Sequence, residues 1–220
     1  MKQDMTTADI AAWLSTFVHQ VEANTAWLSE LDAATGDADH GANLKRGMVA
    51  IRSLIEAQEG HGRPGEYFRQ VGLTIVDTVG GSSGALYGTI FLRFAATVGP
   101  DRDVVDSETM AAGLEAACRG IVDRGRARAG DKTMYDALEP AARAFRAAFT
   151  AGEPIEACWK SAGEAAAAGA AATSSMRARR GKSSYVGEKS IGTVDPGAAS
   201  VALLISAASD AISASRRSTF

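Results

Sequence analysis

Several features are scarce or absent in this 220-residue chain, and each absence excludes a class of protein. Only Cys118 and Cys158 are cysteines, and their wide spacing fits no metal or redox motif, which suits a reducing compartment. Residues 1–9 lack the basic patch and apolar run of a signal peptide. No uncharged apolar stretch is long enough to span a membrane. We therefore expect a cytoplasmic protein with no membrane partner.

An excess of positive charge is also missing. The chain carries 23 Lys and Arg residues against 26 Asp and Glu residues, a net charge of −3, and it has no basic stripe. Nucleic-acid-binding proteins generally present such a stripe, so we expect no nucleic-acid partner. The hydrophobic fraction of 46% is typical of a globular protein. A chain of this length suffices for one core and is short for two, so we expect a single domain over residues 1–220.

Strand-forming runs of alternating β-branched and aromatic residues are likewise absent. Apolar residues instead recur at steps of three and four, the spacing of an amphipathic helix. Such stripes begin near residues 10, 44, 68, 86, 114, 134, 154 and 196. Ser107 is the expected N-cap of the fifth helix, and Asp195 with Pro196 is the expected start of the eighth. The sequence thus predicts an all-α fold of eight helices.

The densest chemical signal is a group of three aspartates. Asp32 ends the first predicted helix, where the helix dipole disfavours a carboxylate, and Asp37 and Asp39 follow in a turn bracketed by glycines. Three carboxylates this close repel one another unless a cation lies between them. Oxygen ligands of this kind select magnesium, manganese or calcium over zinc. The alternative is that they only form turns and cap the next helix, but the presence of all three favours a metal site.

Two further segments could bind phosphate. His40 and Asn43 lie at the start of the second helix and could donate hydrogen bonds to phosphate oxygens, or could be an exposed histidine and a capping side chain. Residues 78–84 are rich in glycine and precede the fourth helix, whose first amides would suit an anion. A flexible turn has the same composition, and no P-loop lysine follows these glycines.

Four loops join an odd-numbered predicted helix to an even-numbered one, and all four are polar and rich in glycine. They are the aspartate cluster and residues 78–84, 124–134 and 179–197. Up-and-down packing would bring these loops to one end of the molecule, so we predict one composite site there. Basic side chains in these loops could bind phosphate or could be ordinary solvated residues. They are Lys132, Arg179, Arg180, Lys182 and Lys189.

With these motifs in view, the chain resembles the ADP-binding L subunits of bacterial dihydroxyacetone kinases, which are equivalent to the C-terminal domain of single-chain ATP-dependent kinases. The matching motifs follow the family's order over nearly the whole chain. They are GDADHG (residues 36–41), GGSSG (80–84), GDKTM (130–134), SSYVGEKSIG (183–192) and DPG (195–197). The resemblance implies an antiparallel up-and-down barrel of eight helices with the nucleotide at one rim.

The resemblance also implies the ligands of the site. Asp32, Asp37 and Asp39 would hold two Mg2+ ions that bridge the phosphates of ADP or ATP. The residues that would contact the phosphates are His40, Gly41, Ala42, Asn43, Ser82 and Ser83. The residues that would surround the rest of the nucleotide are Gly125, Met134, Lys182, Asp195, Pro196 and Gly197. Position 182 is lysine where we expect arginine in relatives, so a planar fork of donors is lost there. No catalytic residue beyond this magnesium–nucleotide site is implied.

The implied reaction is transfer of the terminal phosphoryl group to dihydroxyacetone held on a separate K subunit. The family binds this substrate through a histidine, and none of His19, His40 and His61 lies in a matching context. An M subunit of the phosphotransferase system would rephosphorylate the ADP in place. Three alternatives remain. The chain could be a kinase subunit that exchanges free ATP, for dihydroxyacetone or another short ketose, or an ADP-loaded regulatory module that binds a transcription factor. It could also be a helical hydrolase of ADP-ribose conjugates, although the other matching loops argue against this. A homodimer is a further open question.

Overall fold

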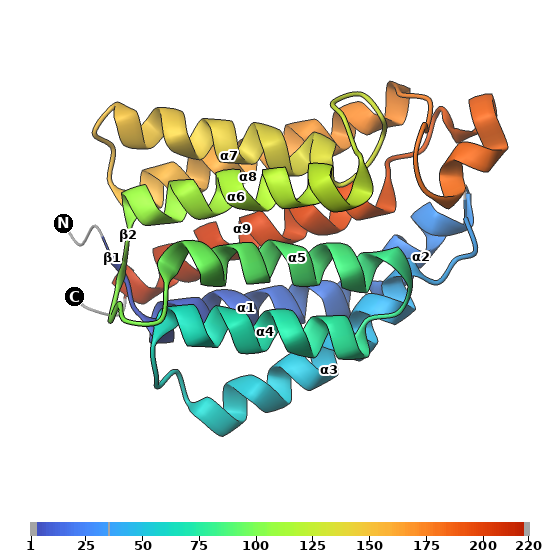
Figure 1. Cartoon of the computed structure of the whole chain (residues 1–220). Coiled ribbons are helices and arrows are strands. Elements are labelled where there is room, and N and C mark those ends of the chain that lie inside the picture. Colours follow the sequence, from blue (N-terminus) through green and yellow to red (C-terminus); the bar gives the residue numbers. More distant parts are fainter. Residues whose placement is uncertain (1–3, 35, 218–220) are drawn as a thin grey trace.

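The structure is a computed structural model that describes residues 4–34 and 36–217, with only the backbone of residues 216 and 217. Most of these residues are helical, and the two strands are short, which confirms the predicted all-α fold (Figure 1). The long helices are α1 (Thr7–Ala23), α3 (His40–Gln58), α4 (Pro64–Thr78), α5 (Gly81–Val98), α6 (Ser107–Gly125), α7 (Tyr135–Thr150), α8 (Ile155–Ala172) and α9 (Pro196–Arg217). The shorter segments are α2 (Thr25–Ala33) and the 3-10 helices η1 (Thr173–Ser175) and η2 (Lys182–Ser190).

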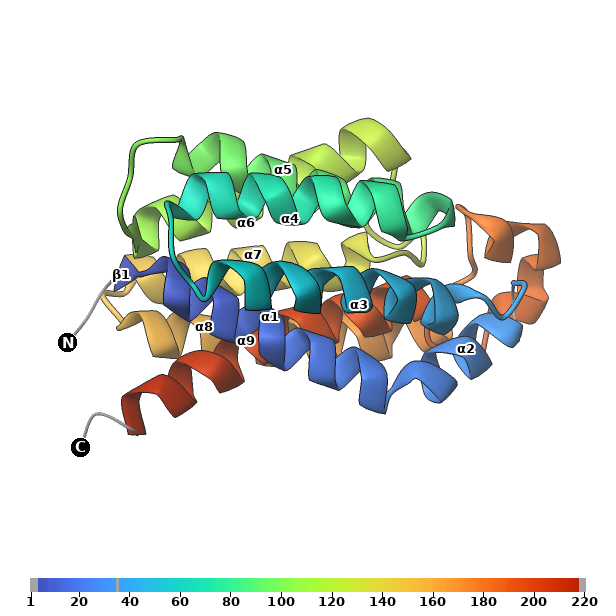
Figure 2. The same ribbon diagram turned by 90° about the horizontal axis from the view of Figure 1, so that it is seen from below.

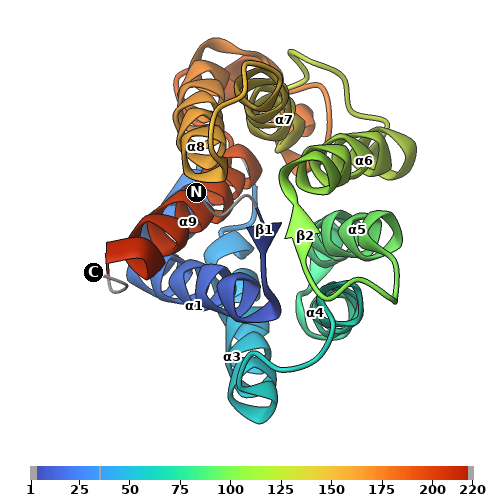
Figure 3. The ribbon, with the colours of Figure 1, turned by 90° about the vertical axis from the view of Figure 1, so that its left-hand side faces the viewer.

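The long helices form a closed ring in chain order. Each packs against the next from α3 to α9, α1 packs against α3, and α9 closes the ring against α1. Figure 3 views this ring end-on, and Figure 1 shows that successive helices alternate in direction. The connections that follow α2, α4, α6 and α8 therefore lie at one end, on the right of Figure 1. This end carries the polar, glycine-rich loops.

Trp13 of α1 is buried inside the ring and contacts several of its helices. It is fully buried, and its indole Nε1 donates a hydrogen bond to the carbonyl oxygen of Leu204 on α9 at 2.8 Å. Aromatic rings from α4, α5 and α8 surround it, with centroids 5.1–6.2 Å from its own. They belong to Phe68, Phe94 and Trp159. One side chain of α1 thus contacts four other helices, so the ring is filled by packed side chains around Trp13.

We expect Trp13→Ala to lower the free energy of unfolding by about 3–5 kcal/mol, because it opens a cavity among these helices. Urea denaturation followed by far-UV circular dichroism measures this change. Trp27 on α2 is 41% exposed and serves as the matched control. Trp27→Ala should change the free energy of unfolding by no more than about 0.5 kcal/mol. Equal losses in the two variants would contradict a central role for Trp13.

The first predicted helix is in fact two helices. Asn24 ends α1 and precedes α2 with φ −108° and ψ 11°, and its side-chain amide donates to the carbonyl oxygen of Gln20 at 2.8 Å. The apolar stripe does not reveal this break, because Val21 and Leu28 keep a helical spacing across it. Asp32 therefore lies near the end of α2, a separate short helix that follows α1 after the break at Asn24.

Two other local predictions were wrong. Asp106, not Ser107, is the N-cap of α6, and its carboxylate accepts a hydrogen bond from the Thr109 amide at 2.7 Å. Asp106 has extended backbone one residue ahead of the helix, whereas Ser107 is already helical. A short antiparallel pair also joins β1 (Asp4–Met5) to β2 (Val105–Asp106), where no strand was expected. Strands of two residues are too short to show alternation in the sequence.

The start of α9 agrees with the sequence. Asp195 precedes the helix, and its Oδ2 accepts a hydrogen bond from the Ala198 amide at 2.8 Å, as an N-cap does. Within the described residues, Pro196–Ser215 is the one stretch long and apolar enough to cross a membrane by length and composition. More than half of it is buried in the protein, between α1 and α8, which is typical of a core helix.

Candidate active site

A pocket of about 240 Å³ opens at the end of the ring where the four polar loops meet. Each loop contributes lining residues, from the aspartate cluster to the turn at residues 195–197. Figures 1 and 2 both show α2 and η2 next to each other at this end. The prediction of one composite site, drawn from the alternating helix directions, is thus in agreement with the structure.

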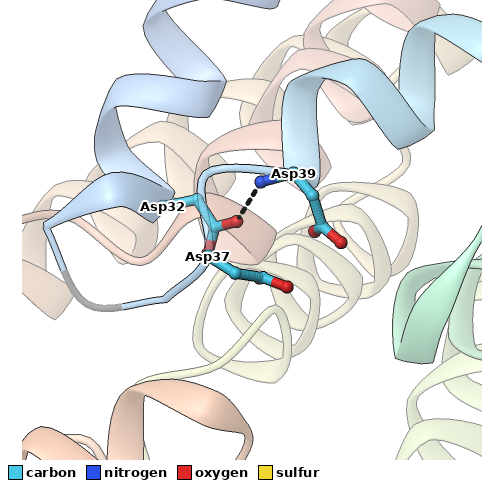
Figure 4. Close-up of side chains that lie close together, drawn as sticks. All are labelled: Asp32, Asp37 and Asp39. Atoms are coloured by element: carbon cyan, nitrogen blue, oxygen red, sulfur yellow. Dashed lines mark hydrogen bonds between the residues drawn. The ribbon is translucent and has the colours of Figure 1, made fainter.

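Asp32 joins the end of α2 to the start of α3. It is 8% exposed, and its Oδ2 accepts hydrogen bonds from the backbone amides of Asp39 at 2.9 Å and His40 at 3.1 Å. Figure 4 shows the first of these bonds. Both amides belong to the positively polarised first turn of α3, where a carboxylate is stabilising. The side chain of Asp39, which occupies the N-cap position of α3, makes no capping hydrogen bond. Asp32 on the preceding helix, α2, caps α3 instead.

Asp37 and Asp39 bring two more carboxylates to the same turn. One oxygen from each of the three side chains lies within 4.8 Å of the others. Figure 4 shows them gathered between the end of α2 and the start of α3. Carboxylate oxygens that converge in this way suit a hard divalent cation such as Mg2+. The residues therefore fit the metal that the sequence predicts here.

The Lys182 ammonium group lies against this cluster. It forms an ion pair with Asp37 and lies 3.8 Å from Oδ2 of Asp39. The hydrogen bond from Lys182 holds the pKa of Asp37 below its usual range, and the same bond raises the pKa of Lys182. Lys182 belongs to η2, far along the chain from Asp37. The fourth polar loop thus supplies a positively charged side chain to the first.

The start of α5 adds groups that suit an anion. Gly80 is its N-cap, and no side chain caps the helix, so the amides of the first turn have no capping partner. Gly80, Gly81, Ser82 and Ser83 all line the pocket. Amides at a helix N-terminus bind phosphate well. Gly84 is required for this tight turn, because a methyl group there would overlap the carbonyl oxygen of Val79.

His40 lines the pocket, but both of its ring nitrogens already have partners. Nε2 lies 2.9 Å from the Ser200 hydroxyl and Nδ1 lies 3.2 Å from the Ser83 hydroxyl. The residue is 6% exposed, and its burial lowers the pKa of the imidazole, which favours the neutral form. Donation from His40 directly to a phosphate would require one of these bonds to break, and that contact stays a prediction.

The remaining predicted site residues divide into two groups. Those that line the pocket are Asn43, Ser82, Ser83, Gly125, Met134, Lys182, Asp195, Pro196 and Gly197. Gly41 and Ala42 lie outside its lining. Gly41 packs closely against α2, where a methyl group would overlap the carbonyl oxygen of Thr25, and Ala42 is exposed. A role for these two residues in binding stays a prediction.

Lys132 is a buried structural cation. It is 1% exposed, and its ammonium group donates hydrogen bonds to the carbonyl oxygens of Thr173, at 2.6 Å, and Thr193. These bonds tie the third polar loop to the fourth. Burial raises the pKa of Asp195 to about 7, and the positive charge of nearby Lys132 opposes that rise. Lys132 is therefore not an ordinary solvated lysine, because the two carbonyl groups accept hydrogen bonds from its ammonium group. It also lines the pocket, and a contact with phosphate stays a prediction.

The other basic residues of these loops differ in position. Arg180 lines the pocket, and its Nε lies 3.3 Å from Oδ2 of Asp131. Arg179 and Lys189 are exposed and outside the lining. Of the five basic side chains considered from the sequence, Arg180 and Lys182 are therefore the two that combine exposure with a place at the pocket.

The sequence did not reveal an apolar wall of the pocket. Leu86, Ile121 and Ala127 line it together with Met134. Leu86 and Ile121 belong to the helical stripes, so periodicity alone assigns them to the core, and Ala127 carries no signal of its own. An apolar wall opposite polar groups is typical of a site for a small organic ligand.

Comparison with known proteins shows the family to which the chain belongs. Residues 34–210 match the DAK2 domain family. The chain is 38% identical to the PEP-dependent dihydroxyacetone kinase 1, ADP-binding subunit DhaL, of Listeria innocua, over 89% of this chain and 91% of that protein. It is 32% identical to the L-erythrulose kinase of Pectobacterium atrosepticum, over 96% of this chain and 36% of that protein. The fold is similar to that in the crystal structure of the dihydroxyacetone kinase from C. freundii in complex with AMP-PNP and Mg2+, with a TM-score of 0.69. The two sequences are 24% identical, and the match covers 96% of this chain and 35% of that chain.

The position of Asp32 depends on Gly36, because a methyl group there would overlap Oδ1 of Asp32. We expect Gly36→Ala to weaken binding of Mg2+ in the presence of ADP by roughly 10- to 100-fold, as changes beside a metal ligand commonly do. Isothermal titration calorimetry measures this affinity. Gly163 on α8 is the control, since a methyl group there meets nothing closer than 3.7 Å. Unchanged affinity in Gly36→Ala would exclude Asp32 from the cation site.

Proposed function

We propose that this chain, which belongs to the DAK2 domain family, is the nucleotide-binding subunit of a dihydroxyacetone kinase. It is a phosphotransferase subunit that carries a magnesium-bound adenine nucleotide and passes on its terminal phosphoryl group. The observation that carries the proposal is a single pocket that joins three carboxylates, an uncapped helix N-terminus and an apolar wall. We further propose that residues 1–220 form one domain and act in the cytoplasm.

Each part of the pocket suits one part of the nucleotide. Asp32, Asp37 and Asp39 would hold two Mg2+ ions against the phosphates. The phosphates would lie at the first turn of α5, beside Ser82 and Ser83. The adenine would lie against the apolar wall that contains Met134, near Gly125 and residues 195–197. His40 to Asn43 would complete the phosphate end of the site.

The chemistry requires little beyond this arrangement. Phosphoryl transfer depends mainly on positioning and on neutralising the charge of the phosphate oxygens. Bound magnesium would supply most of that neutralisation. The protein's own contribution is to hold three carboxylates together, to aim helix amides into the pocket and to bring Lys182 to its mouth. No covalent intermediate on this chain is needed.

The acceptor and the donor come from other proteins in this proposal. Dihydroxyacetone would be held on a separate K subunit that docks at the open rim of the ring. The Listeria relative is named as a PEP-dependent kinase subunit, which favours a donor other than free ATP. We therefore propose that an M subunit rephosphorylates ADP that stays bound. The similarity to an L-erythrulose kinase supports a second candidate, phosphorylation of another short ketose by the same site.

We expect Asp37→Asn to abolish phosphoryl transfer while the helices remain, because the substitution removes a cation ligand from an exposed turn. The assay combines the variant with its K subunit, phosphorylated M subunit and dihydroxyacetone, and circular dichroism checks the fold. Asp77 is exposed on α4 and outside the pocket lining, so Asp77→Asn is the matched control. Transfer at the wild-type rate by Asp37→Asn would mean that the cluster only forms a turn and a cap.

We also expect the purified protein to contain near-stoichiometric ADP that survives desalting when Mg2+ is present. A nucleotide held by four loops and bridging cations should dissociate slowly, because several charge-assisted contacts must break together. Acid release followed by chromatography identifies the nucleotide. Turnover with the K subunit should be slow on added ATP and fast with phosphorylated M subunit. Fast, saturable turnover on ATP alone, with labelled ATP exchanging freely, would instead indicate an ATP-exchanging kinase.

A further inference from the structure

Two arginine-rich segments lie at the end of the ring that carries the pocket (Figure 1). Residues 124–130 span the end of α6 and the loop after it, and residues 176–182 run from η1 to the start of η2. The first segment holds three basic residues and the second holds four, with no Asp or Glu in either. They are Arg124, Arg126, Arg128, Arg177, Arg179, Arg180 and Lys182. The whole chain has a net charge of −3, so positive charge is concentrated at this end.

Each segment contains an Arg-Ala-Arg triplet with the same pattern of burial. Ala127 and Ala178 are 4% and 3% exposed, whereas the arginine on either side of each is exposed. The small side chain thus anchors the segment, and both long side chains face solvent. Ala127 also lines the pocket, so the first triplet borders it.

Asp131 holds the two triplets beside each other. Its Oδ2 accepts a hydrogen bond from the Arg128 amide at 3.0 Å, and its carbonyl oxygen accepts one from the Arg179 amide at 3.0 Å. The same Oδ2 lies 3.3 Å from Nε of Arg180. The four arginines of the triplets therefore form one surface, which we call the arginine patch. They are Arg126, Arg128, Arg177 and Arg179.

The arginine patch has no counter-charge of its own. Within the described part of the chain, none of its four side chains forms an ion pair or a hydrogen bond, and the nearby Asp131 is buried against Arg180. Seven arginines elsewhere in the structure each lie beside a carboxylate. They are Arg52, Arg63, Arg69, Arg93, Arg102, Arg143 and Arg146. Like charges gathered without partners repel one another, so this surface suits an external anionic group.

Exposed apolar side chains of η2 continue this surface. Tyr185 is 90% exposed, and Val186 and Ile191 are also exposed. Nη2 of Arg177 lies 3.7 Å from the position of a β-carbon on Gly187, so η2 adjoins the patch. Tyrosine and arginine together are typical of protein–protein interfaces. A nucleic acid is a less suitable partner, because a long polyanion would also meet the rest of a chain with negative net charge.

We propose that the arginine patch and Tyr185 form a docking surface for a protein with an acidic face, namely the protein that brings the phosphoryl acceptor to the pocket. This inference rests on the proposed function, since it takes the K subunit as that protein. The patch borders the pocket, so a partner seated on it would present its substrate to the nucleotide. The arginines speed the encounter by long-range attraction, and Tyr185 packs in the complex once it has formed.

The two roles are tested by measuring the rates at which the full chain, loaded with ADP and Mg2+, binds and releases the K subunit. Arg177→Gln with Arg179→Gln removes two charges and keeps the backbone hydrogen bond of residue 179. This variant should associate roughly tenfold more slowly at low salt, and the difference should disappear at high salt. Tyr185→Ala should dissociate roughly tenfold faster with little change in association. Rates equal to those of the wild type in both variants would overturn the proposal.

A matched control removes the same charge from another face. Arg143 on α7 and Lys160 on α8 have side chains that are 76% and 74% exposed, and both lie outside the pocket lining. Arg143→Gln with Lys160→Gln should associate with the K subunit as fast as the wild type does. The affinity for ADP with Mg2+ should stay unchanged in all of these variants. An equal loss of ADP affinity in the patch variant would mean that the arginines serve the nucleotide and not a partner.

A peptide of ten glutamates tests the patch without the K subunit. It should bind the wild-type chain in a salt-dependent manner and bind the patch variant several-fold more weakly. Equal binding to both proteins would overturn the proposal. Tighter binding of single-stranded DNA or of anionic vesicles to the same arginines would also overturn it, because the partner would then not be a protein. If the wild type neither binds a K subunit nor transfers phosphate with it, the proposed function fails. Phosphoryl transfer with unchanged rates in the patch variants would leave that function intact and reject this surface alone.

Discussion

The end of the ring that carries the site depends on one carboxylate. Asp32 comes from the last turn of α2 and accepts hydrogen bonds from two amides of α3, so it fixes the angle at which the chain turns between these helices. The same side chain lies within 4.8 Å of oxygens from Asp37 and Asp39. Capping and cation binding, which the sequence presents as alternatives, are compatible in this geometry. The cap positions the carboxylate, and the carboxylate is then available to a cation.

The other loops are held by similar buried polar contacts. Lys132 joins the third loop to the fourth through two carbonyl groups, and His40 joins α3 to α5 and α9. A buried lysine or histidine is costly unless its polar groups find hydrogen-bond partners. Lys132 donates to two carbonyl oxygens, and each ring nitrogen of His40 has a hydroxyl partner. The closed ring brings the four loops to one end, and these contacts fix the loops relative to one another.

The spacing of apolar residues predicted the helices, because that spacing is a local property of the sequence. The alternation of helix direction then predicted that the four loops from odd-numbered to even-numbered predicted helices meet at one end. The features that the sequence did not reveal are tertiary. Val21 and Leu28 keep their spacing across the break at Asn24, so the pattern cannot show that the helix changes direction. Lys132 looks like any loop lysine until two distant carbonyl groups enclose it. Ile121 is a buried core residue, and helical spacing cannot show that it also lines the pocket.

Charge balance gives a physical reason to favour two divalent cations over one. The cluster offers three carboxylates, and within the described part of the chain one basic side chain, Lys182, is in contact with it. The phosphates of ADP would add about three further negative charges near neutral pH. One Mg2+ together with Lys182 would leave most of that charge uncompensated in a partly enclosed pocket, where repulsion is weakly screened. A second Mg2+ would bring the total close to neutrality. A cation held by Asp37 would compete with Lys182 for the charge of that carboxylate, so loading would weaken their ion pair and leave the ammonium group more available to the phosphates at the pocket mouth.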